Sequence, residues 1–540
     1  MEFIMIEIYG EQPQSKRQQF EVARQCLPMS RRGESMFAED QSGVIRFLEK
    51  LRGANAVERI ETHISYIFLI GDRAFKMKRA VKLPYVDFST PRLRLEACEK
   101  EVALNALTAP GLYIGVRKIM RGKDGRLGFD EGEELVDAAV EMVRFDQGAL
   151  FDRMAVDGRL TAELMTRAAR MIARFHRGAP IIHQGSGSAN IAGVLRINAA
   201  GFATSRVFGA DELADFNRAF EQKLTVHAPL LDAREAGGRV RRCHGDLHLR
   251  NIYLINGEPR LFDCIEFNDQ IATVDTLYDL AFLLMDLWHR GFPELANLVA
   301  NRYLDETQDE EGFVLLPYFM GIRAAVRAHV TATQVEECSV RSDKLAADSR
   351  AYFELARALI ETQRARLIVI GGFSGSGKTT VAEVLAAQFG SPPGARIVES
   401  DRIRKAMHGV QAEERLGPAA YCPEVSEKVY GDMARRTFAI LRAGGSVVAD
   451  AVFDRAPNRA RIEAVAQEAG VPCTAVWLDV KTSLLRRRVA SRSVSPSDAD
   501  LEVLSRQLAA DTKGITWQLV DADRDAHEIA RAILELQSGS

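Results

Sequence analysis

Hydrophobic positions along the chain change their spacing twice, and these changes divide it into three parts. Residues 1–35 are polar without a clear period, which is typical of a loosely ordered tail. Residues 36–362 begin with short alternating segments and continue with helical patterns, which predicts an α+β domain with a small mixed lobe, a helical lobe and a cleft between them. In residues 363–540 short apolar runs alternate with helical stretches, which predicts an α/β domain with a parallel sheet.

The mixed lobe opens with a predicted hairpin, because strand-like segments at 64–70 and 74–78 are joined by Gly71-Asp72. Ser89-Thr90-Pro91 is a helix start signal, and the helical pattern that follows it runs to about Leu107. Two further strand segments and the helices of the second lobe are predicted at 113–120, 138–145, 161–177, 211–228, 273–289, 293–307, 314–336 and 345–363.

The third part has five predicted strands, at 367–370, 396–399, 446–449, 474–478 and 516–520. Directly after the first strand, residues 372–379 fit the phosphate-binding pattern of Gly, four residues and Gly-Lys-Ser/Thr in full. Glycines let backbone N–H groups converge on phosphates, while Lys378 reaches the β- and γ-phosphates and the Thr379 hydroxyl ligates Mg²⁺. The predicted nucleotide contacts of this loop are Gly372, Ser374, Gly375, Ser376, Gly377, Lys378, Thr379 and Thr380.

Charged residues near the ends of the following elements are further candidates. Asp401 could accept the proton of a substrate hydroxyl, with Arg404 one helical turn on as a substrate contact; an N-cap aspartate beside a solvated arginine is the alternative. Asp450 ends a buried strand and could hold Mg²⁺, or could merely terminate the strand. Arg488 and Arg492 share a helix face and could close over the γ-phosphate as catalytic cations, unless they form a plain basic surface.

Two lysines mark the second strand of the hairpin. Lys76 and Lys78 point to the same face by the period of two, which is unusual for a half-buried strand, although a solvated edge strand would also allow it. On the helix that follows, Glu101 shares the inward side and could pair with the strand lysine, with Glu99 as the alternative.

The second chemical signature is His244-Gly245-Asp246-Leu247-His248-Leu249-Arg250-Asn251, followed by a short strand, the Gly257 turn and Asp263. Phosphoryl transfer from ATP needs one carboxylate to accept the proton of the attacking hydroxyl and further oxygen ligands for Mg²⁺. Asp246 fits the first role, and Asn251 and Asp263 fit the second. A turn, a cap and a strand end are the respective structural alternatives.

In these residues the chain resembles the aminoglycoside phosphotransferase family, over about residues 40–360. The resemblance implies a protein-kinase-like two-lobe fold in which Asp246 is the catalytic base and Asn251 and Asp263 are Mg²⁺ ligands. It also implies that Lys76 contacts the α/β-phosphates with Glu101 as its partner, and that Met142 and Val143, in the segment 141–143, meet adenine as a hinge. The chain departs from the pattern because the hairpin carries Gly71 in place of a Gly-x-Gly-x-x-Gly loop.

The third part is similar to the small P-loop kinases grouped with gluconate kinases, zeta toxins and phage polynucleotide kinases. This resemblance covers about residues 366–538 and rests on the 372–379 loop, Ser400-Asp401 with Arg404, 448–451 and the 485–492 segment. It implies an α/β P-loop NTPase domain in which Asp401 is the substrate-hydroxyl base and Arg488 and Arg492 are lid arginines. The whole order resembles bacterial bifunctional aminoglycoside phosphotransferase/ATP-binding proteins.

Composition and net charge limit the classes of molecule that we expect this protein to bind. A net charge of −3 argues against a dedicated nucleic-acid or anionic-membrane binder, and the seven scattered cysteines fit a reducing cytoplasm. No secretory signal or membrane span is expected. We therefore expect a cytoplasmic protein with two ATP- and Mg²⁺-dependent phosphotransferase domains that act on hydroxyls of small molecules. The alternatives are a nucleotide-gated regulatory protein in which one domain binds ATP without transfer, and polynucleotide 5′-hydroxyl kinase activity in the second domain.

Overall fold

The computed structural model describes residues 39–51, 57–62, 64–83, 86–337, 342–491, 497–509 and 514–538. It divides into two compact units. The first comprises the residues up to Leu283 together with Met320–Ala358, and the second comprises Leu284–Phe319 together with the residues from Leu359 onward. The predicted tail 1–35 lies outside the described residues, and the predicted boundary between 362 and 363 stays a prediction.

The first unit begins with a six-stranded antiparallel sheet in the order β1-β2-β3-β8-β6-β7. Its strands are β1 Glu58–Glu61, β2 Ser65–Ile70, β3 Arg73–Lys78, β6 Tyr113–Arg121, β7 Leu127–Phe129 and β8 Glu134–Val143. Strands β2 and β3 form the predicted hairpin, with Ser65 opposite Lys78 and Ile70 opposite Arg73. Strand β3 is a central strand rather than an edge, so Lys76 and Lys78 cannot point to solvent as the edge-strand alternative required.

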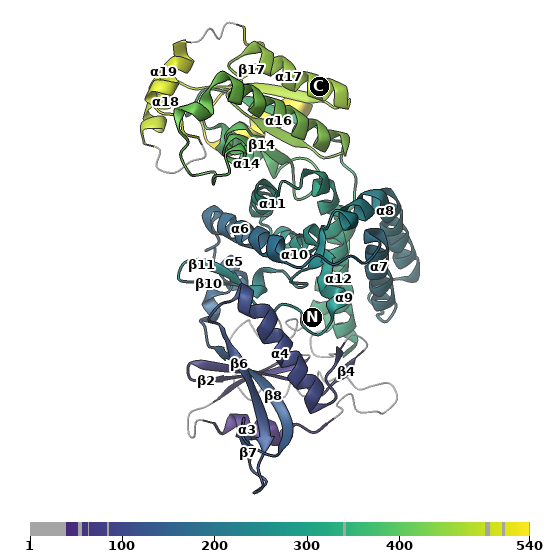
Figure 1. The fold of residues 1–540 in the computed structure, drawn as a ribbon. Helices are drawn as coiled ribbons and strands as arrows, with labels where there is room; N and C mark the ends of the chain where they lie inside the picture. Colours follow the sequence, from purple (N-terminus) through teal and green to yellow (C-terminus); the bar gives the residue numbers. More distant parts are fainter. Residues whose placement is uncertain are drawn as a thin grey trace. The chain divides into compact units, whose positions relative to one another are not determined.

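Helix α4, Pro91–Thr108, packs on this sheet against β6 and β8 (Figure 1). It begins as predicted, because the Thr90 hydroxyl accepts a hydrogen bond from the Leu93 N–H and Pro91 occupies the first turn. Its buried face is unusually polar and includes Arg94 and Glu101. Arg94 donates to Asp137 on β8 at 2.8 Å, so an ion pair as well as apolar contact joins helix and sheet.

The rest of the first unit is mostly helical, as predicted. Its main helices are α5 Phe151–Val156, α6 Ala162–Gly178, α7 Gly187–Phe202, α8 Ala210–Ala236, α10 Thr276–His289, α12 Leu316–Glu337 and α13 Ser342–Leu359. One end of α10, one end of α12 and the last residue of α13 belong to the second unit. Two short antiparallel pairs lie among them: β10 Ile252–Ile255 with β11 Glu258–Leu261, and β9 Val240–Arg242 with β12 Thr273–Asp275. Helix α7 was not predicted, and α8 extends past the predicted end at 228 although it contains Pro229.

The second unit contains a five-stranded parallel sheet in the order β14-β15-β13-β16-β17. Its strands are β13 Leu367–Gly371, β14 Arg396–Glu399, β15 Val447–Asp450, β16 Cys473–Asp479 and β17 Gln518–Asp521, close to the predicted positions. Ile368 and Ile370 pack with apolar residues of α14 Lys378–Ala386 and α20 Ala526–Ser538. The intervening Val369 points to the opposite face by the period of two, and both faces of β13 are buried.

The remaining helices of the second unit are α11 Pro293–Thr307, α15 Ser400–Met407, α16 Pro423–Arg442, α17 Ala456–Ala469, α18 Thr482–Ala490 and α19 Leu501–Ala509. Helix α11 precedes the parallel sheet in sequence by many residues, yet it packs on α14. The P-loop unit therefore includes a helix from the part of the chain that the sequence pattern places in the first domain.

One stretch of the described chain, Glu310–Val335, is long and apolar enough to cross a membrane by length and composition. Of its most apolar window, 67% is buried inside the protein, which is typical of a core helix.

Candidate active sites

In the first unit, the two strand lysines meet one helix carboxylate. Lys76 Nζ donates to Glu101 Oε1 at 3.1 Å, and Lys78 Nζ donates to Glu101 Oε2 at 2.6 Å. All three side chains are almost fully buried, and a carboxylate in such a place needs cationic partners to offset its desolvation. The carboxylate that contacts both lysines is therefore Glu101 rather than the alternative Glu99.

Each lysine also reaches a carboxylate in the segment after β11. Lys76 Nζ lies 2.6 Å from Asp263 Oδ1, and Lys78 Nζ lies 2.5 Å from Glu266 Oε1. Asp263 has a left-handed backbone with φ of 62°, which is uncommon for a residue other than glycine. Glu266 was not among the predicted site residues. Its spacing of three from Asp263 gave no periodic signal, because this segment is neither helix nor strand.

The loop between β9 and β10 carries the predicted base. Asn251 Nδ2 donates to the Asp246 carbonyl at 2.8 Å and to Asp246 Oδ2 at 3.1 Å, and His248 Nε2 lies 3.3 Å from the same Oδ2. Gly245 has φ of +85°, and a Cβ there would lie 3.0 Å from Ile265 Cδ1. Glycine is thus required just before Asp246 by both conformation and space.

A buried carboxylate on α10 fixes the start of this loop. Asp279 accepts hydrogen bonds from the His244 N–H at 3.2 Å and the Gly245 N–H at 2.8 Å. Burial alone would raise the pKa of Asp279, but the hydrogen bond from His176 and the nearby charges hold the pKa below its usual value. Asp279 therefore stays an acceptor. Asp279 was not among the site residues predicted from the sequence.

The oxygen donors of this site suit Mg²⁺. Asn251 Oδ1 is buried and has no hydrogen-bond partner among the described residues, and the Asn251 amide bonds to Asp246, which lines a cavity together with Asp263. Amide and carboxylate oxygens are the ligands that Mg²⁺ prefers. An unpartnered buried carbonyl oxygen costs free energy unless a ligand meets it, so Asn251 and Asp263 fit the metal role predicted for them.

An open cavity of about 660 Å³ of empty space, part of it solvent, lies beside Asp246. Asp263 and Glu266 line one side, and one face of α12, represented by Arg323 and Arg327, lines another. Arg323 Nη1 donates to the Gly245 carbonyl at 3.2 Å and so also supports the loop before Asp246. The base therefore faces a space that admits a small molecule.

Met142 and Val143, the predicted hinge residues, lie at the end of β8. Met142 is paired with Ala74 and Tyr113 in the sheet, and the Val143 N–H donates to the Leu112 carbonyl at 2.9 Å. That donor is already used, so the Val143 N–H is not available to adenine in this conformation. The adenine contact of this segment stays a prediction.

In the second unit, the 372–379 loop joins β13 to α14 as predicted. Gly375 and Gly377 have φ of +86° and +91°, conformations that favour glycine. Lys378 Nζ donates to the Phe373 carbonyl at 3.2 Å, the Ser374 N–H donates to Gln507 Oε1 at 2.9 Å, and Ser376 Oγ is buried without a hydrogen-bond partner among the described residues. Gly372 begins the loop with φ of +150°, and Thr380 is exposed on α14, where its nucleotide contact stays a prediction.

Two carboxylates meet the hydroxyl at the start of α14. Thr379 Oγ1 donates to Asp450 Oδ2 at 2.8 Å and lies 3.3 Å from Glu399 Oε1. Glu399 and Asp450 end adjacent parallel strands in register, and their side chains are buried. Burial, together with repulsion from nearby carboxylates, raises the pKa of Asp450 to about 6 and the pKa of Glu399 to about 8. These three oxygen donors fit a Mg²⁺ site, and Glu399 is a candidate ligand that was not predicted from the sequence.

Glu399 could have been found by the argument that identified Asp450. Both residues end buried strands of a nucleotide-binding sheet, where a carboxylate is seldom placed without use.

Asp401 and Arg404 lie on α15. Burial raises the pKa of Asp401, and the Lys378 charge opposes this shift, so the two side chains interact electrostatically. Arg404 is buried rather than solvated; its Nη1 donates to the Ala420 carbonyl at 2.6 Å and its guanidinium lies over the Tyr421 ring. Its Nε has no hydrogen-bond partner among the described residues, which leaves a donor for a substrate.

Helix α18 brings Arg488 to the loop. Arg488 Nη1 lies 3.4 Å from the carbonyls of both Gly375 and Ser376. A guanidinium held at the phosphate loop can neutralise charge on a transferred phosphoryl group, as predicted for it. Arg492, its predicted companion, lies outside the described residues.

Comparisons with known proteins agree with this division. Residues 90–313 match the family described as "Phosphotransferase enzyme family", and residues 367–512 match the family described as "AAA domain". An uncharacterized protein of Mycobacterium tuberculosis (strain ATCC 25618 / H37Rv) is 26% identical over 470 residues, which are 85% of this chain and 91% of that protein. The two-part order is thus shared along nearly the whole length of this relative.

Two further similarities each cover one part of the chain. The adenylyl-sulfate kinase of Myxococcus xanthus (strain DK1622) is 26% identical over 125 residues, which are 23% of this chain and 62% of that protein. The crystal structure of a choline/ethanolamine kinase family protein from Mesorhizobium loti covers 60% of this chain and 96% of that chain, with 14% identity and a TM-score of 0.39. The chain therefore joins a region that matches the phosphotransferase enzyme family to a P-loop region that matches the AAA domain family.

Proposed function

We propose that both units transfer the γ-phosphoryl group of ATP to hydroxyl groups of small molecules. The observation that carries this proposal is that Asp246 and Asp263 line one cavity in the first unit, with Asn251 bonded to Asp246 and Lys76 bonded to Asp263. A base, oxygen ligands for a metal and a cation are the parts that phosphoryl transfer requires. The second unit has its own phosphate-binding loop, candidate base and candidate metal ligands, and these support the same chemistry.

In the first unit, Asp246 would accept the proton of an acceptor hydroxyl bound in the cavity. The Asn251 amide holds one oxygen of Asp246 through its 3.1 Å hydrogen bond, so the other oxygen can face the acceptor. Glu101 holds Lys76 where its ammonium can contact ATP phosphates. Mg²⁺ bound to Asn251 and Asp263 would supply neutralisation of the phosphate charge.

In the second unit, the glycine-rich loop and Lys378 would bind the phosphates of ATP, and Arg488 would contact the transferred group. Asp401 would accept the proton of the acceptor hydroxyl, since burial raises its pKa toward the range useful for a base. Arg404, with an unpartnered Nε, would orient the acceptor. Thr379, Asp450 and Glu399 would hold Mg²⁺.

The test is incubation of the purified chain with labelled ATP and a metabolite extract, with products identified by mass. Asp246→Asn should remove one set of phosphorylated products and Lys378→Ala another. Turnover of ATP without any phosphorylated product would favour a nucleotide-gated regulatory protein. If neither substitution changes ATP turnover, the proposal fails. We also propose that the protein is cytoplasmic, and fractionation of cells tests this location.

A further inference from the structure

Helix α11 is built into the edge of the parallel sheet in the second unit. Asn301 Oδ1 accepts a hydrogen bond from the Ile397 N–H at 2.7 Å, and Asn297 Nδ2 donates to the Ala395 carbonyl at 2.9 Å. These side chains meet backbone groups at the start of β14, an edge strand of its sheet. The amides of α11 therefore take the place of a further strand along part of this edge.

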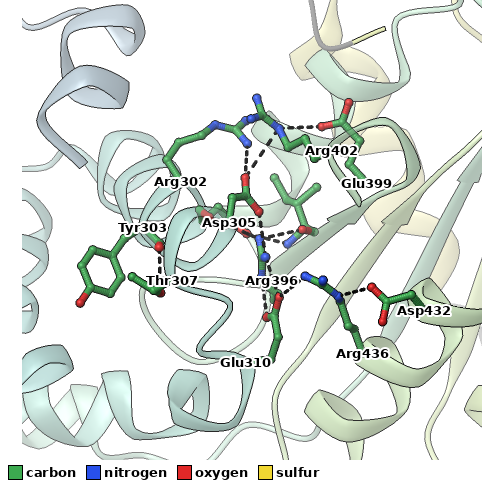
Figure 2. A network of polar contacts seen from close by, with 12 residues as sticks. Arg302, Tyr303, Asp305, Thr307, Glu310, Arg396, Glu399, Arg402, Asp432 and Arg436 are labelled. Carbon is green, nitrogen blue, oxygen red and sulfur yellow. Dashed lines mark hydrogen bonds and ion pairs between the residues drawn. The ribbon is translucent and has the colours of Figure 1, made fainter. Parts of the chain in front are cut away.

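A buried cation fixes the same junction. Arg396 is 2% exposed, and it lies 2.8 Å from both oxygens of Glu310 and 2.8 Å from Asp305 Oδ1 (Figure 2). A guanidinium so deeply buried needs this compensation, because an unpaired buried charge costs several kcal/mol. Asp305 is consequently held in place by its contact with Arg396.

The second oxygen of Asp305 extends the network toward the phosphate loop. Asp305 Oδ2 lies 3.6 Å from Arg402 Nε, and Arg402 Nε donates to Glu399 Oε2 at 2.9 Å, as Figure 2 shows. The other oxygen of Glu399 is the one that lies 3.3 Å from the Thr379 hydroxyl. One oxygen of Glu399 thus accepts a hydrogen bond from Arg402, and the other faces the candidate metal site.

We propose that Asp305 and Arg402 are positioning residues that hold Glu399 in the orientation in which it binds Mg²⁺ beside the phosphate loop. The inference rests on the proposed function of the second unit. It assigns α11, which precedes the P-loop region in sequence, a part in the metal site of that region. Among the described contacts, neither side chain bonds to Thr379 or Asp450, so both would act through Glu399.

Charge supports this role. Glu399 and Asp450 end neighbouring strands, and two close carboxylates would push each other away from the shared hydroxyl. Arg402 offsets the charge of Glu399 on the side away from the loop. Asp305 Oδ2 lies between Arg402 and Arg302, whose Nη1 donates to it at 2.9 Å. Burial alone would raise the pKa of Asp305, but the cations Arg396, Arg402 and Arg302 bring that pKa to about 2.

The test measures how much Mg²⁺ strengthens ATP binding, in the full chain with Lys76→Ala and Asp263→Asn added to weaken nucleotide binding in the first unit. Arg402→Gln should leave the ATP dissociation constant in EDTA unchanged and reduce the gain from Mg²⁺ about 10-fold, the size of effect typical of residues that orient metal ligands. Asp305→Asn should reduce the gain in the same direction, and Arg402→Lys should restore part of it.

Arg436→Gln is the matched control, because Arg436 contacts Glu310 and Asp432 in the same network but no metal-site carboxylate. It should leave the gain from Mg²⁺ unchanged, even if it lowers the melting temperature. If Arg436→Gln reduces the gain as much as Arg402→Gln, or if Arg402→Gln weakens binding equally in EDTA, the network is a scaffold and the proposal is wrong. If Lys378→Ala and Mg²⁺ both leave ATP binding unchanged, the proposed function itself fails.

Discussion

Lys76 and Asp263 are 187 residues apart in the chain, yet Lys76 Nζ lies 2.6 Å from Asp263 Oδ1. The cation proposed for phosphates and the carboxylate proposed for Mg²⁺ therefore form a direct ion pair. If Mg²⁺ is bound, Asp263 would be one of the residues that hold it, and Lys76, kept in place by Glu101, would contact the phosphates.

Asp263→Asn should therefore lower transfer by the first unit about 100-fold or more, since it removes several kcal/mol of charge stabilisation. The melting temperature should change little, because Lys76 keeps Glu101. Transfer is measured with labelled ATP, and products of the second unit serve as the internal control. An unchanged first-unit rate would contradict the role of Asp263.

Lys78 should matter more for stability than for nucleotide binding. Lys78→Met leaves Glu101 and Glu266 buried without their shared cation, which should cost about 3–5 kcal/mol of unfolding free energy. Urea denaturation measures the loss. Lys82→Met is the control, because the Lys82–Asp87 pair is exposed, and ion pairs in water contribute little to stability. Equal losses of unfolding free energy in the two variants would show that the buried ion pairs contribute no more to stability than the exposed pair.

Gly375 should not tolerate a side chain. A Cβ there would lie 2.9 Å from Val489 Cγ2 and 3.0 Å from the Leu485 carbonyl, so Gly375→Ala should push α18, and with it Arg488, away from the loop. ATP binding should weaken about 10-fold or more, as expected for misplaced phosphate contacts. Calorimetric titration of ATP measures the effect.

Gly431→Ala provides the comparison for Gly375→Ala. Gly431 lies within α16 with no atom near the position of an added Cβ, so the change should be neutral or stabilising by up to about 1 kcal/mol. ATP affinity should stay unchanged. If both alanine variants bind ATP normally, the close packing of α18 on the loop is not required.

The metal-free second unit should lose stability as pH rises. The pKa of Asp450 is raised to about 6 and that of Glu399 to about 8, so the folded state binds these protons more tightly than the unfolded chain. Their stabilising contribution is therefore complete at about pH 4 and is lost as pH rises through 6 and 8. Melting temperatures measured in EDTA across this window should fall less steeply for Asp450→Asn than for the unchanged chain.

Mg²⁺ should reverse this trend, because it binds the deprotonated carboxylates. The gain in melting temperature from Mg²⁺ and ATP should be larger at pH 8 than at pH 6. Equal gains at the two pH values, or an Asp450→Asn variant as pH-sensitive as the unchanged chain, would contradict the assignment of these carboxylates.

Local patterns predicted much of the fold. Strands 396–399 and 367–370 were placed almost to the residue, since buried parallel strands read as short apolar runs between helical stretches. Helix α7 was not predicted because its sequence lacks a clear polar face and contains poor helix formers, including Gly187, Gly193 and Gly201. Tertiary packing forms this helix.

Candidate site residues could be named where a motif fixed their spacing, as for Lys378 and Asp246, and their roles stay predictions. Glu266 and Asp305 were not named, because their roles arise from partners 188 and about 90 residues away in the chain. Long-range pairing of this kind leaves no local period. The hinge prediction at Val143 depended on resemblance, and the structure uses that N–H within the sheet.

The carboxylate partners of Arg396 decide where this chain can be cut. Glu310 and Asp305 both precede residue 363, so an expression fragment begun there would keep the guanidinium and lose every acid that compensates it. The Ile397 N–H would also lose Asn301. Such a truncation should aggregate or unfold, whereas one begun near residue 284 would carry its counter-ions along.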